Sequence, residues 1–146
     1  MTVDSGYYES LTRGIEGEYA AGMAGNTYSQ TLARNRGNRD LSFMKQSFQR
    51  GVPSFTAGFG QRGFGGGGVR SGVMQRAMSN YLGDFQRTYS GAEQDLTDQL
   101  RQYDLTAAQL GAQRTSALAD IELQRAREIS LTAQNIEALR AAFGGL

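Results

Sequence analysis

Residues 96–129 read LTDQLRQYDLTAAQLGAQRTSALADIELQRAREI, a stretch without proline and with Gly111 as its one glycine. Its first apolar residues recur at steps of four and three, which is the spacing of a helix that packs along one face; they are Leu96, Leu100, Tyr103, Ala107 and Leu110. Two series then step by eleven, Phe85–Leu96–Ala107–Leu118–Ile129 and Leu110–Ile121–Thr132–Phe143. An eleven-residue repeat keeps its stripe on a nearly straight helix. The stretch therefore predicts a long helix with one thin apolar stripe.

The same helical pattern extends over residues 73–142, which contain no proline. The segment Ser90–Glu93 fits a capping box, so a fresh helix start is expected there. We therefore expect two helices, at 72–88 and 91–142. Gly144 is a natural helix stop.

A second amphipathic pattern occupies residues 4–24. Tyr8, Leu11, Ile15 and Tyr19 recur at helical spacing. Glycines within the segment weaken the helix by roughly 1 kcal/mol each relative to alanine, so it needs a surface to lie on. The stripe is either an ordinary core-facing stripe or an anchor for another subunit. Turn-forming residues then predict a loop over 25–37, followed by a short helix over 40–50.

Residues 51–72, GVPSFTAGFGQRGFGGGGVRSG, are rich in glycine and contain the single proline, Pro53. So much glycine disfavours a regular helix or strand because of its entropy cost, so we expect a flexible strap. A pure spacer would not need Phe55, Phe59 and Phe64. These rings are expected to fit into pockets on neighbouring subunits.

The composition excludes several classes of enzyme. The 146 residues include no cysteine, histidine or tryptophan, which removes thiol nucleophiles, cysteine-type zinc sites and the commonest general base. Paired carboxylates such as Asp95 and Asp98 are best explained as a solvated helix face. The glycine run at 65–68 lacks the Gly-Lys-Ser/Thr ending and the preceding strand of a phosphate-binding loop. We expect no catalytic, cofactor or metal site, and no small-molecule substrate.

Composition also points to a chain that depends on assembly. Leu, Ile, Val and Phe make up about 19 % of the residues, just under the roughly 20 % below which a chain struggles to bury enough apolar surface. No apolar run approaches the length of a membrane span. Residues 1–9 lack the pattern of a secretory signal. The required burial is therefore expected between subunits.

Charge is concentrated in the middle of the chain. Residues 34–76 are strongly basic, whereas the flanking segments 1–33 and 77–146 are mildly acidic. This region fits either an acidic neighbour or a phosphate backbone, and the segment around Arg62 resembles Arg-Gly-rich sequences that bind single strands. The candidate contact residues are Arg34, Arg36, Arg39, Arg50, Arg62, Arg70 and Arg76.

The arrangement of these segments resembles a known class of protein. Short N-terminal helices lead to Arg62–Gly63 and then Arg70–Ser71–Gly72–Val73. A long Gln-, Ala- and Arg-rich helix follows, with Phe-Gln-Arg, Tyr-Asp-Leu and Gln-Arg elements at 84–87, 103–105 and 113–114. Over residues 35–135 this resembles small virion structural proteins of tailed bacteriophages. The resemblance implies a non-enzymatic, multi-copy component near the portal, head–tail connector or tail, assembled in the bacterial host cytoplasm.

These observations predict a mainly α, extended, non-globular chain that assembles as an oligomer. We expect short helices and a loop at 1–50, the strap at 51–72 and a long helical region at 73–146. Its partners are expected to be other copies of itself and other virion proteins. The alternatives are a nucleic-acid-binding protein that uses the basic middle, or an ejected internal virion protein that refolds on DNA or a membrane. The predicted interface residues are Tyr8, Leu11, Ile15, Tyr19, Phe55, Phe59, Phe64, Leu96, Leu100, Tyr103, Leu110, Leu118 and Ile121.

Overall fold

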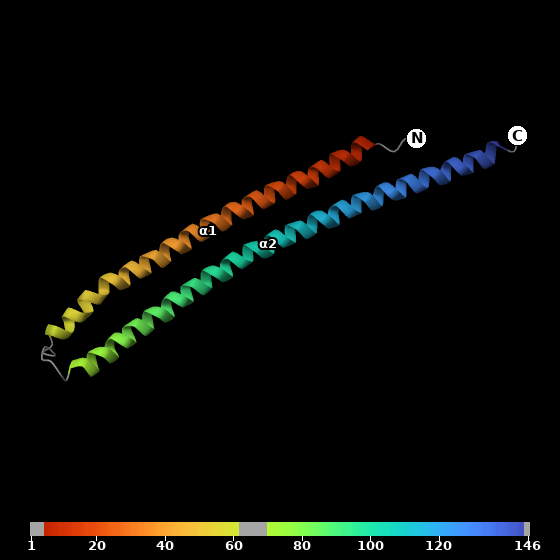
Figure 1. Cartoon of the computed structure of the whole chain (residues 1–146). Helices are drawn as coiled ribbons and strands as arrows, with labels where there is room; N and C mark the ends of the chain where they lie inside the picture. The colour runs from red at the N-terminus through yellow and green to blue at the C-terminus, as the bar shows by residue number, and fades with distance from the viewer. Residues whose placement is uncertain (1–4, 62–69, 145–146) are drawn as a thin grey trace. The chain divides into compact units, whose positions relative to one another are not determined.

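Two long helices make up the part of the chain that the computed structural model describes, residues 5–61 and 70–144. Helix α1 runs over Ser5–Gln61, 57 residues, and helix α2 over Arg70–Phe143, 74 residues. Figure 1 shows both helices, and these two ranges contain no strand. The mainly α class expected from the apolar spacing is confirmed.

The predicted loop over 25–37 is wrong, because α1 continues through it. Of the turn-forming residues in this segment, Asn26 and Gly37 are half-buried, whereas Asn35 is exposed. Ala33 is only 9 % exposed, and a Cβ placed on Gly37 would collide with the side chain of Leu96. Gly37 thus permits close approach of two helices rather than a turn. The separate short helix expected over 40–50 is likewise part of α1.

The predicted helix break at Ser90 is also wrong, because α2 is continuous from Arg70. Ser90 and Gly91 are exposed, whereas Tyr89 and Ala92 on either side are half-buried. The half-buried residues keep the same helical spacing before and after Ser90. Packing therefore keeps α2 continuous at a sequence that could otherwise begin a new helix. The end of α2 is as expected, since the N–H of Gly144 donates to the carbonyl of Arg140 at 2.7 Å.

Part of the predicted strap is helical. Residues 51–61 form the last turns of α1, which include Pro53, and α2 begins at Arg70. Proline inside a helix removes one backbone hydrogen bond and clashes with the preceding turn, so this end of α1 depends on packing. Residues 62–69, with Phe64, lie outside the described residues, as does the side chain of Phe59.

The chain divides into two compact units. Unit 1 joins residues 1–28 to 104–146, and unit 2 comprises residues 29–103. Each unit pairs a segment of α1 with a segment of α2 that runs in the opposite direction. We call the line along which these segments pack the seam. Because a pair of helices encloses little volume, Tyr8 and Ala33 are the buried apolar residues of the described chain.

Candidate functional site

Residues of the predicted apolar stripes lie on the seam of each unit. In unit 1, Tyr8 is buried, and Leu11, Ile15, Tyr19, Leu110, Leu118 and Ile121 are half-buried. In unit 2, the half-buried positions include Phe55, Leu96, Leu100 and Tyr103. The structure thus brings these residues together within one chain. Their use as contacts between subunits stays a prediction.

Tyr8 is the most enclosed side chain of unit 1, at 4 % exposure. Its burial, and the neighbouring Glu128 carboxylate, raise the pKa of Tyr8. Ser5 and Tyr8 line a shallow groove together with Ile121 and Arg125. These contacts place the first turns of α1 beside residues 121–128 of α2.

An ion pair that sequence reasoning missed crosses the seam of unit 1. The Arg114 guanidinium donates two hydrogen bonds to Glu16, from Nε to Oε2 at 2.8 Å and from Nη2 to Oε1 at 2.6 Å. The guanidinium carbon also lies 5.0 Å from the ring centroid of Tyr19. The hydrogen bonds from Arg114 lower the pKa of Glu16, and they raise the pKa of Arg114. A bidentate pair has a fixed geometry, so it sets the register of α1 against α2.

A stack of aromatic rings, of which sequence reasoning identified Phe55 and Phe85 but not Tyr81 and Tyr89, holds the seam of unit 2. The Tyr81 ring stacks on Phe55 with centroids 4.8 Å apart and on Phe48 at 5.0 Å. Phe48 also stacks on Phe85 at 4.1 Å, and Tyr89 lies 5.5 Å beyond Phe85. Phe48 and Phe55 lie on either side of Pro53, so the stack fixes α1 where its backbone is weakest. The seven-residue interval between Phe48 and Phe55 could have indicated that both rings lie on one face of a helix.

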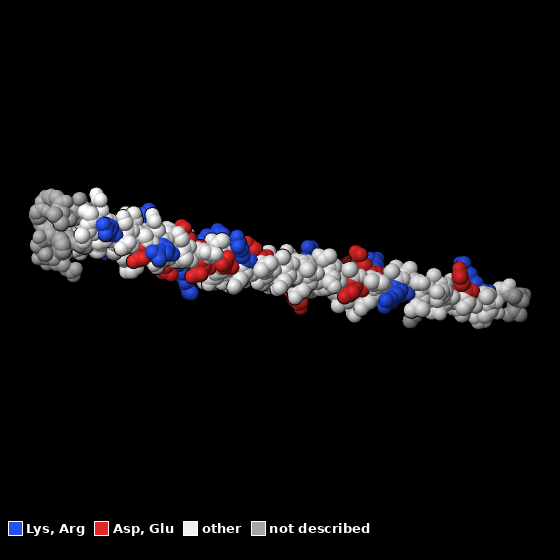
Figure 2. Space-filling model, turned by 90° about the horizontal axis from the view of Figure 1, so that it is seen from below, with Lys and Arg blue, Asp and Glu red and all other residues white. Residues whose placement is uncertain are grey.

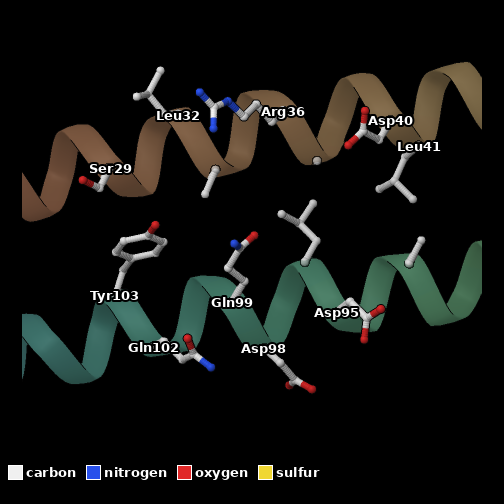
Figure 3. A pocket seen from close by; sticks show the side chains of 14 residues that line it. Ser29, Leu32, Arg36, Asp40, Leu41, Asp95, Asp98, Gln99, Gln102 and Tyr103 are labelled. Carbon is white, nitrogen blue, oxygen red and sulfur yellow. The ribbon is translucent and has the colours of Figure 1, made fainter.

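A shallow groove follows the seam of unit 2 beside this stack. In Figure 3, Gln99 and Tyr103 extend from α2 toward α1, and Asp98 points away from the groove. Arg36 and Asp40 line it from α1. The lining mixes amides, both charges and aliphatic carbon without converging polar groups, so we assign no ligand to it. Within the described residues, no group of acidic side chains has the arrangement of a metal site.

The predicted cations of α1 lie on its outer surface. Arg34, Arg36, Arg39 and Arg50 are exposed, as is Arg76 on α2. Arg62 and the side chain of Arg70 lie outside the described residues. At 3.6 residues per turn, Arg36, Arg39, Phe43 and Arg50 fall on one face within an arc of about 60°. Phe43 is 68 % exposed within this basic stripe. On the face shown in Figure 2, acidic and basic side chains otherwise lie among one another.

The last turns of α2 carry an apolar face that the seam of unit 1 does not cover. Ile129 is 49 % exposed, Ile136 46 %, Leu139 57 % and Phe143 71 %. With Thr132 they fall within an arc of about 80°, in line with Leu118 and Ile121. We call Ile129, Thr132, Ile136, Leu139 and Phe143 the terminal stripe. The eleven-residue pattern identified three of its members, whereas Ile136 and Leu139 were missed, although Ile129, Ile136 and Phe143 recur at steps of seven.

Comparisons with known proteins identify no relative, because no family model, curated protein or solved structure matches this chain. Among the described residues, no helix has the length and apolar content needed to cross a membrane.

Proposed function

We propose that this protein is a non-enzymatic structural component that works in several copies. The observation that carries the proposal is the imbalance between buried and exposed apolar side chains. Tyr8 and Ala33 are the buried apolar residues of the described chain, whereas many large apolar side chains are at least 40 % exposed, among them Leu82, Leu105, Leu123, Leu131 and the apolar members of the terminal stripe. A chain of this kind gains the missing burial by packing against other chains.

The finer form of the proposal is a virion protein of a tailed bacteriophage, at the portal, head–tail connector or tail channel. The resemblance of residues 35–135 supports this form. Long helices with one thin apolar stripe each also suit packing against neighbouring copies or against another helical protein of a particle. The remaining exposed surface is polar and of mixed charge, which suits a hydrated position within such an assembly.

Light scattering on a sizing column, with circular dichroism on the eluted peak, tests the multi-copy proposal. We expect a helical species of discrete size that contains several chains. A helical monomer at every concentration would contradict the proposal. Mass spectrometry of purified particles from the host culture tests the finer form, which requires this chain in the particle band at several copies.

A second candidate function is nucleic-acid binding, favoured by the basic stripe on α1. Arg36, Arg39 and Arg50 are spaced to follow a phosphate backbone, and the exposed ring of Phe43 among them offers a stacking surface for bases. A steep fall of affinity for a labelled single strand as salt concentration rises is the expected result, and no binding at low salt would contradict this candidate.

A further inference from the structure

The uncovered part of α2 continues the face on which α1 packs. The half-buried positions of α2 in unit 1 include Leu118 and Ile121, and a step of eleven from each leads to Ile129 and Thr132. In the described chain α1 begins at Ser5, beside Arg125. Beyond that point the four apolar members of the terminal stripe are exposed on the same face, and Thr132 is half-buried. A partner helix that covers the terminal stripe would therefore pack on the same face of α2 as α1 does, end to end with α1.

We infer that the terminal stripe binds the terminal stripe of a second copy, with the two α2 ends antiparallel. The inference rests on the proposed multi-copy function and names the partner surface. A second α2 end that runs antiparallel has the same direction as α1 and fits in line with it. A parallel partner would meet the first α1 within one or two turns, because α1 occupies the same face from residue 128 downward.

The position of α1 also sets the register. The first turns of α1 lie beside Ile121 and Arg125, so the partner helix must end before that level. A register that places Thr132 opposite Phe143 of the second copy, and Ile136 opposite its Leu139, meets this condition. It pairs the small side chain with the largest one and the two aliphatic side chains with each other, as close packing requires.

Charges on the flank of the stripe favour the same direction. Glu137 and Arg140 lie on one flank of the terminal stripe at 3.6 residues per turn. An antiparallel pair sets like flanks against each other, so Arg140 of each copy lies near Glu137 of the other. In a parallel pair, the flank with Glu137 and Arg140 would instead face the other flank of the second copy. That flank carries Asn135 and has no acidic residue beside Arg140.

The small size of the stripe makes the association reversible. Four paired side chains per copy bury far less than the ~800 Å² per partner of a standard protein interface. We therefore expect a dimer population that rises with concentration, and further contacts along the helices in larger assemblies.

Disulfide trapping in the full-length chain tests both contact and direction, since the natural sequence has no cysteine. We expect Thr132→Cys and Phe143→Cys to form a dimer when the two variants are mixed and oxidised, and each to stay largely uncoupled alone. In the antiparallel register, residue 132 of the two copies is separated by eleven residues along the axis, about 16 Å, beyond disulfide reach. Coupling of each variant with itself would indicate a parallel pair and overturn the inference.

A charge substitution with a matched control supplies the second arm. Ile136→Glu should weaken self-association measured by sedimentation at least about tenfold. Leu131→Glu makes the same change at a side chain that is 58 % exposed but lies outside the stripe, so it should leave association within about twofold. If multimers form normally with Ile136→Glu and no mixed disulfide appears, this inference fails while the multi-copy function stands. A wild-type monomer at all concentrations would overturn both, including the case in which it binds lipid vesicles instead.

Discussion

At the scale of single residues, the seam depends on small side chains as much as on large ones. Gly37 brings α1 close enough to α2 for Leu96 to pack on its backbone, and a Cβ on Gly51 would collide with the Tyr81 hydroxyl. Glycine costs stability inside an isolated helix, yet here its missing side chain makes room for a neighbour. The same residue type therefore has opposite effects at seam and surface positions.

We predict that Gly37→Ala and Gly91→Ala change stability in opposite directions. The added Cβ at Gly37 meets Leu96, which should lower the free energy of unfolding of unit 2 by about 1–3 kcal/mol. Gly91 has open space around its Cα, so alanine there should raise it by about 0.5–1 kcal/mol. Urea denaturation followed by circular dichroism measures both. Adding Leu96→Ala to Gly37→Ala should relieve the collision; two strictly additive losses would show that the close contact is not the cause.

The Glu16–Arg114 pair predicts an acid-sensitive register in unit 1. Because the pKa of Glu16 is lowered from its ordinary value of 4.5, the unfolded chain binds this proton more readily than the folded one. The stabilising effect is therefore complete above about pH 4.5 and is lost as pH falls through the lowered pKa. Glu16→Gln should reduce stability at pH 7 and flatten the pH dependence of thermal unfolding between pH 5 and roughly 3.

A charge reversal provides the control for this pair. The double variant Glu16→Arg with Arg114→Glu restores opposite charges and should recover much of the stability that either single reversal removes. The effect should also shrink in 1 M salt, where screening is strong. Equal pH profiles for the wild type and Glu16→Gln would show that other carboxylates govern the acid response.

At the scale of helices, the apolar spacing predicted more of the structure than the turn-forming residues did. Steps of three, four and eleven correctly predicted a helix over 91–142 and its half-buried face from Leu96 to Ile121, but not that α2 is continuous from Arg70. The loop at 25–37 and the break at Ser90 were wrong because capping and turn preferences amount to about 1 kcal/mol each, and packing along the seam overrides them. The ion pair between Glu16 and Arg114 joins residues 98 apart, and a local pattern does not show which distant residue will lie opposite.

The aromatic stack predicts how the end of α1 responds to mutation. Tyr81 contacts Phe48 and Phe55 on the two sides of Pro53, so Tyr81→Ala should release the last turns of α1. We expect Tyr81→Ala to lower the free energy of unfolding by about 2 kcal/mol. This is less than the ~3–5 kcal/mol lost when a fully buried aromatic side chain is removed, because Tyr81 is half-buried. Hydrogen exchange should accelerate over residues 50–58 in particular.

Phe43→Ala is the matched control for this substitution, since Phe43 lies on α1 of the same unit but is 68 % exposed. It should change stability by less than about 0.5 kcal/mol. Similar losses for Phe43→Ala and Tyr81→Ala would mean that the stack does not hold this end of α1.

At the scale of the whole molecule, the salt dependence of DNA binding separates the two proposed functions. If the basic stripe binds a nucleic-acid single strand, the logarithm of affinity should fall linearly with the logarithm of salt concentration. Replacing Arg36, Arg39 and Arg50 by glutamine should reduce the slope by about 0.7 for each lost phosphate contact. Fluorescence anisotropy with a labelled single-stranded oligonucleotide measures this, and no binding at 50 mM salt would exclude the nucleic-acid function.

The thin seam has a consequence for how the protein comes apart. Each turn of helix contacts the turns before and after it and the segment across the seam, so stability accumulates along one dimension, as in repeat proteins. Within the described residues, neither unit has a central interior whose loss would unfold that unit all at once. The thermal transition should be broad, hydrogen exchange should vary gradually along α1 and α2, and a single melting temperature would describe neither unit well. Binding of neighbouring chains along the helices would then act as the cooperative element that the monomer lacks.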